Sequence, residues 1–112
     1  MVNIEIKPAI RCDSGYISVF GHAKTAPKGE DLVCCAITTL VDALEANLRS
    51  CWDIRVMSQR ESGHVRISWI KTDHRGVGIN RANIYAGFVE NALRELAKAY
   101  PAALEVHRKR RE

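Results

Sequence analysis

A histidine and a cysteine occur close together in the first third of the sequence. They lie in the stretch Gly21-His22-Ala23, followed after a short segment by Gly29-Glu30-Asp31-Leu32-Val33-Cys34-Cys35-Ala36. The thiolate is the reactive form of cysteine, and an adjacent imidazole can take the thiol proton and later return it to a leaving amine. His22 and Cys34 are therefore candidates for attack on a carbonyl group. The commoner role of such a cysteine is that of a small buried hydrophobe, and a lone histidine is more often structural or exposed.

The residues after Asp31 predict the element that would carry Cys34. Apolar side chains recur at three- and four-residue spacing to Leu48, which predicts an amphipathic helix with Asp31 as its N-cap. Cys34 would then lie in the first helical turn, where free backbone N–H groups favour a thiolate and can stabilise an oxyanion. The alternative role for Asp31 is to orient the imidazole of His22, as the third group does in other nucleophile–base systems.

The remaining pattern predicts an α+β fold with a mostly antiparallel sheet, both helices packed on one face, and the order ββαββα(β). Period-two alternation and turn residues place strands at 2–7, 16–20, 53–58 and 64–71, with a short last strand at 103–107. Residues 21–30 are predicted to form a loop. A second helix is expected from 82 to 99, with Phe88 and Val89 among the residues of its buried face. Trp52 and Trp69 are expected to be core or dimer contacts.

Length and composition indicate a single soluble domain over residues 1–107, followed by a basic tail at 108–112. Four of the 17 cations lie in that tail, so most of the net charge of +4 belongs to it. The tail is the segment expected to make any weak electrostatic contact with RNA. No apolar run is long enough to span a membrane, no signal-peptide core follows Met1, and the protein is expected in the cytosol.

The cysteine and glycine patterns bear on cofactors, and the predicted sheet bears on partners. The four cysteines show no CxxC pair, so no metal is predicted, and no cofactor either. Gly76-Val77-Gly78 is only a weak phosphate-binding signal, because it lacks the third glycine and the lysine of a P-loop. The sheet face or edge that the helices leave uncovered favours a homodimer.

The motif Gly21-His22-Ala23, then Gly29-x-Asp31-Leu32-Val33-Cys34-x-Ala36, resembles that of the ribosomal-processing cysteine protease family, Prp. The resemblance extends over the whole chain. It implies a small homodimeric protease that removes a short N-terminal extension from a large-subunit ribosomal protein, number twenty-seven. It also implies that Cys34 is the nucleophile, His22 the general base and acid, and Asp31 a supporting residue. The intervening loop would move on hinges at Gly21 and Gly29 and order around the substrate.

Two other functions are compatible with the residues alone. In the first, the chain is a non-enzymatic ribosome- or RNA-associated module in which Cys34 is structural and the basic tail binds phosphate. In the second, the vicinal thiols act as a redox sensor that requires Cys35 as well as Cys34.

Overall fold

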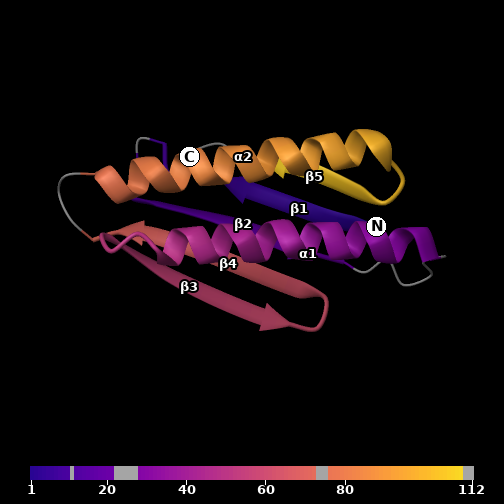
Figure 1. The fold of residues 1–112 in the computed structure, drawn as a ribbon, viewed down its shortest axis with the longest axis horizontal. Helices are drawn as coiled ribbons and strands as arrows, with labels where there is room; N and C mark the ends of the chain where they lie inside the picture. Colours follow the sequence, from indigo (N-terminus) through magenta and orange to yellow (C-terminus); the bar gives the residue numbers. More distant parts are fainter. Residues whose placement is uncertain (11, 22–27, 73–75, 110–112) are drawn as a thin grey trace.

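The computed structural model describes residues 1–10, 12–21, 28–72 and 76–109, and for residues 28–31 it describes the backbone alone. Figure 1 shows two helices side by side, running in opposite directions, in front of one sheet. The elements in chain order are β1 (Val2–Lys7), β2 (Ser14–Phe20), α1 (Lys28–Arg49), β3 (Ile54–Glu61), β4 (His64–Lys71), α2 (Val77–Ala99) and β5 (Leu104–Arg108). The predicted α+β class and element order are confirmed. No helix within the described ranges is long and apolar enough to cross a membrane.

The five strands form one sheet in the order β3-β4-β2-β1-β5. Every pair is antiparallel except β1 with β5, which is parallel, so the sheet is mixed rather than wholly antiparallel. Val19 of β2 pairs with Ile4 of β1 on one side and with Val65 of β4 on the other. This pairing brings the end of β2 next to the turn between β3 and β4, although about forty residues separate them in the sequence.

The hydrophobic core lies between the sheet and the two helices. The alternating strand residues predicted to face inward are buried, as is the predicted stripe of α1. The most enclosed members are Ile4, Ile6, Ile17, Ile67, Trp69, Leu44, Leu48, Leu93 and Leu104. Trp69 is therefore a core residue, whereas Trp52 is 79% exposed. Val89 is buried as predicted, but the prediction was wrong for Phe88, which is 72% exposed because it lies outside the buried stripe of α2, formed by Ala82, Ala86, Val89 and Leu93.

Helix α1 begins at Lys28, before the position predicted from apolar spacing. Gly29 and Asp31 are therefore inside the first turn, so Gly29 is not a loop hinge and Asp31 is not the N-cap. The residues of this first turn show no apolar periodicity, so the spacing that predicted the rest of the helix gives no signal for them. The prediction had used apolar spacing alone.

Helix α2 also begins earlier than predicted, at Val77. The buried carboxylate of Asp53, which precedes β3, accepts a 2.7 Å hydrogen bond from the backbone N–H of Gly78. A free donor of the first turn is thus satisfied by a residue 25 positions away. A Cβ at position 78 would overlap that carboxylate, which explains why glycine stands there. The Gly76-Val77-Gly78 segment therefore houses an internal carboxylate and does not form a phosphate cradle.

The basic C-terminal segment begins inside the fold. Arg108 belongs to β5 and lies 3.6 Å from the carboxylate of Glu90, while the backbone N–H of Lys109 donates to the carbonyl oxygen of Ile6 at 2.8 Å. The side chain of Lys109 lies 4.0 Å from Glu5. Two cations of the predicted tail are thus partly neutralised by the domain. Residues 110–112 lie outside the described part, and RNA binding by this segment stays a prediction.

Candidate active site

A cleft of about 230 Å³ opens where α1 passes over the end of β2. Cys34, Ile37 and Thr38 line it from α1, and Glu61, Gly63, His64 and Val65 line it from the β3–β4 hairpin. The described lining is completed by Val2 of β1, Val19 of β2 and Gly21, which follows β2. The volume is below that of a typical enclosed small-molecule site. An open cleft of this size suits an extended chain that crosses it.

The four cysteines are all free, and their surroundings distinguish them. Cys51 is buried at the end of α1, with its sulfur 3.7 Å from the carbonyl oxygen of Asn47. Cys12 lies at the other end of β2, 3.7 Å from the ammonium of Lys7. Cys35 is exposed and lines neither described pocket. Of the four, only the partly buried Cys34 lines the cleft, so it is neither a packed core residue nor a fully exposed thiol.

The early start of α1 changes the environment predicted for Cys34. The helix begins at Lys28, so Cys34 is in its second turn, where the backbone N–H groups already have acceptors within the helix. The free N–H groups of the first turn lie about 5–9 Å away along the axis. They do not adjoin the thiol as the sequence suggested. An oxyanion formed at Cys34 needs donors other than these amides.

Gly21 connects β2 to the segment that carries His22. Its backbone has φ +103°, and its N–H donates to the carbonyl oxygen of Gly63 at 3.0 Å. A Cβ at this position would overlap the carbonyl oxygen of Met1. Gly21 therefore has a backbone conformation that other residues rarely adopt, as a turning point requires, and it is tethered to the β3–β4 turn. His22 and the predicted mobile segment up to Pro27 lie outside the described residues.

His64 is the described histidine that borders the cleft. Strand alternation places its side chain on the sheet face away from the helices, because its neighbour Val65 pairs with the inward-facing Val19. The imidazole packs edge-on against the ring of Phe20, with centroids 5.6 Å apart. Although His64 lines the cleft, its imidazole is therefore directed away from the helix that carries Cys34, and it is a poor candidate for the proton acceptor.

A cluster of three charged side chains near the cleft joins β3 to α1. The guanidinium of Arg60 lies 2.7 Å from Glu45 and 2.8 Å from Asp42. The hydrogen bond from Arg60 lowers the pKa of Glu45 below its usual value, and burial opposes this only in part. The two carboxylates in turn raise the pKa of Arg60. The cluster fixes the edge hairpin against α1. Across the described residues, no group of three or more His, Cys, Asp or Glu side chains could hold a metal ion.

Sequence reasoning identified Cys34 but missed most of the cleft around it. Gly63 and Glu61 of the hairpin and Val19 of β2 form its wall and floor. Local spacing carries no signal for these residues, because they reach Cys34 through the pairing of β2 with β4. Only a correct strand order would have found them.

Comparison with known proteins gives one family. A family model described as cysteine protease Prp matches residues 1–105. No curated protein matches the sequence.

Solved structures show the same fold. The essential ribosomal-processing protease Prp from S. aureus, crystallised with a substrate peptide, superposes with a TM-score of 0.79 at 15% identity, covering 97% of this chain and 100% of that one. The same protease with a covalently linked product peptide gives a TM-score of 0.75, again at 15% identity and with the same coverage of both chains. SMU.848 from Streptococcus mutans gives 0.69 at 17% identity, covering 96% of this chain and 93% of that one.

Proposed function

We propose, because the chain belongs to the Prp family of cysteine proteases, that it processes the precursor of a ribosomal protein. The chain is a cysteine protease by that membership. Its substrate in this proposal is large-subunit ribosomal protein number twenty-seven, from which it removes a short N-terminal extension. The S. aureus relative is a ribosomal-processing protease and was captured with a substrate peptide, which supports a peptide substrate of the same kind here.

The observation that carries the assignment of residues is the cleft itself. Cys34 is the cysteine that lines it, and Gly21, the sequence neighbour of His22, lines it too. The thiolate of Cys34 attacks the scissile carbonyl carbon, and His22, having taken the thiol proton, donates it to the leaving amine. The resulting thioester is hydrolysed by water, which gives a proton to His22 as the C–S bond breaks. In this proposal Asp31 orients the imidazole of His22, which is the second of the two roles that the sequence suggests for it.

The non-enzymatic alternative is not favoured. It required Cys34 to be a structural residue, but Cys34 is only partly buried and faces an open cleft. A redox pair with Cys35 has no supporting contact either, since Cys35 lines no described pocket.

Cleavage of the precursor tests the proposal. The extended ribosomal protein is incubated with wild type, Cys34→Ala and the matched control Cys35→Ala, and the product is identified by mass and N-terminal sequence. Wild type and Cys35→Ala should release the extension, and Cys34→Ala should not. Release by Cys34→Ala would remove Cys34 as nucleophile, and no release by wild type would remove this substrate.

The proposal includes a homodimer in the cytosol. Ile84 and Phe88, one turn apart on α2, are 69% and 72% exposed, so they form an apolar pair that a second copy of the chain would cover. Sedimentation of wild type and Phe88→Ser should show a dimer that the substitution weakens. A wild-type monomer at all concentrations would exclude the homodimer, and recovery of the protein outside the cytosolic fraction would exclude the location.

A further inference from the structure

A second, smaller cavity adjoins the cleft of Cys34. It has a volume of about 40 Å³ and is lined by Val19, Ile37, Thr38, Val41, Asp42, Arg60 and Val65. Four of these residues, Val19, Ile37, Thr38 and Val65, also line the cleft. The two hollows therefore form one continuous groove between α1 and the sheet. We call the smaller hollow the valine pocket.

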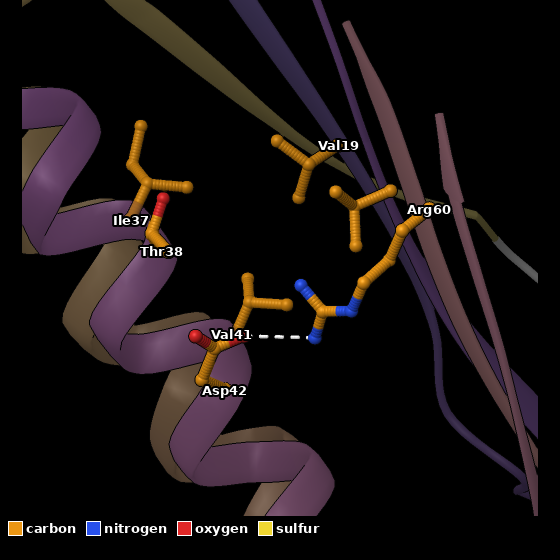
Figure 2. A pocket seen from close by; sticks show the side chains of 7 residues that line it. Val19, Ile37, Thr38, Val41, Asp42 and Arg60 are labelled. Atoms are coloured by element: carbon orange, nitrogen blue, oxygen red, sulfur yellow. Dashed lines mark hydrogen bonds and ion pairs between the residues drawn. The ribbon is translucent and has the colours of Figure 1, made fainter. Parts of the chain in front are cut away.

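The walls of the valine pocket are apolar and its far end is closed by a fixed charge. Figure 2 shows Ile37 and Val41 on the helix side, Val19 on the sheet side, and Arg60 reaching across toward Asp42. The guanidinium of Arg60 is held by both Asp42 and Glu45, at 2.8 and 2.7 Å. Because two carboxylates already satisfy this cation, it closes the pocket without attracting an acidic side chain.

The size of the valine pocket limits what it can hold. A buried water needs about 10–15 Å³ on the same scale, whereas an engineered cavity that binds benzene measures about 150 Å³. A volume of about 40 Å³ lies between these two values, so a short branched aliphatic side chain fits within the hollow, whereas an aromatic ring would extend beyond it. Such a side chain would replace water against the methyl groups of Val19, Val41 and Val65.

The position of the pocket relative to Cys34 sets which substrate residue would reach it. Cys34, Ile37, Thr38 and Val41 follow one stripe of α1, and seven residues of helix span about 10 Å. An extended peptide advances about 3.3 Å per residue. The pocket is therefore about three residues from the bond that Cys34 attacks.

We propose that the valine pocket is a specificity subsite, which selects a short aliphatic side chain about three residues from the cleaved bond, with Arg60 as its size-limiting wall. This inference rests on the proposed peptidase function. It adds a sequence requirement on the substrate and assigns it to named residues outside the nucleophile and base.

Peptide binding to the inactive Cys34→Ala chain tests the subsite apart from catalysis. The probes are positional-scanning hexapeptide pools, acetylated and amidated, with Ala, Val or Phe fixed at each position in turn. At one position the Val pool should bind about tenfold more tightly than the Ala and Phe pools. In Cys34→Ala/Arg60→Ala, the penalty against Phe at that position should disappear. The matched control Cys34→Ala/Arg55→Ala, which changes an exposed arginine of the same strand, should keep it.

A neighbouring pair of threonines provides a second control. Thr38 lines both hollows, whereas Thr39, one residue further along α1, lines neither. Added to Cys34→Ala, Thr38→Leu should fill part of the groove and abolish the preference for Val, and Thr39→Leu should leave it intact.

The outcomes distinguish failure of the proposed subsite from failure of the proposed protease function. The inference is overturned if no pool binds, if no position distinguishes Val from Ala and Phe, or if Arg60→Ala and Arg55→Ala give the same profile. Wild type is then incubated with the pools that bind. Selective binding without cleavage would contradict the protease mechanism and leave the subsite standing.

Discussion

Substituting Gly78 by alanine should destabilise the protein, although glycine inside a helix is normally unfavourable. The new Cβ would overlap the carboxylate of Asp53, which is buried with only 4% of the residue exposed. The carboxylate would have to leave its 2.7 Å hydrogen bond to the Gly78 N–H. Losing a hydrogen bond to a buried charged group costs about 1.5–3 kcal/mol, and alanine returns about 1 kcal/mol of helix propensity. The net loss is about 0.5–2 kcal/mol, which corresponds to a fall in Tm of about 2–9 °C.

Gly87 of the same helix is the matched control. No atom lies within 4 Å of a Cβ built there, so Gly87→Ala should raise stability by about 0.5–1 kcal/mol. Thermal and urea unfolding, followed by circular dichroism, measure both variants. The comparison isolates the clash from helix propensity.

A double-mutant cycle identifies the cause. Once Asp53→Ala has removed the carboxylate, adding Gly78→Ala should stabilise the protein by about 0.5–1 kcal/mol. The effect of Gly78→Ala on stability would then be opposite in sign to its effect in the wild-type chain. The reasoning fails if Gly78→Ala is as stable as Gly87→Ala, or if its effect keeps the same sign in the Asp53→Ala background.

The remaining predictions concern pH and the turn after β2. Arg60 lowers the pKa of Glu45, so this ion pair stabilises the fold above the unfolded pKa and is lost as pH falls through the lower folded value. Glu45→Gln should cost under about 1 kcal/mol in urea unfolding near neutral pH, because Arg60 is 43% exposed, and should cost less in acid. An equal cost at both pH values would contradict this. Gly21→Ala should lower Tm, since its Cβ would meet the Met1 carbonyl; an unchanged Tm would exclude that contact. Peptidase activity should follow a bell-shaped pH profile, as a pair of Cys34 thiolate and imidazolium requires, and a rate that rises without limit into alkaline pH would indicate an unpaired thiol.

The part of the fold that the sequence predicted is the part encoded locally. Alternation along Val2–Lys7 and His64–Lys71 identified two strands within a residue at each end, and the stripe from Val33 to Leu48 identified the buried face of α1. The start of α2 was missed because its first turn is stabilised by Asp53, from another element. No local pattern reports such a contact.

The candidate site also has a part that local sequence predicts and a part that depends on contacts between distant segments. The type and neighbourhood of Cys34 made it a candidate from the sequence, and the cleft supports that choice over Cys35. The prediction that Cys34 lies in the first turn of α1 was wrong. The helix begins at Lys28, and its first residues do not follow the apolar spacing from which the start was predicted. The valine pocket was not predictable, since it needs Arg60 of β3 to meet Asp42 and α1 across the sheet edge.

Labelling by a substrate-like electrophile tests most directly whether Cys34 is the nucleophile. A peptide copying the removed extension, with a chloromethyl ketone in place of the cleaved bond, is incubated with the wild-type chain and the adduct is located by tandem mass spectrometry. Because Cys35 is more exposed than Cys34, modification governed by access alone would favour Cys35. The account predicts one adduct per chain on Cys34, formed faster than with free iodoacetamide and slowed by His22→Ala. Modification mainly of Cys35, or of all exposed thiols at similar rates, would contradict it.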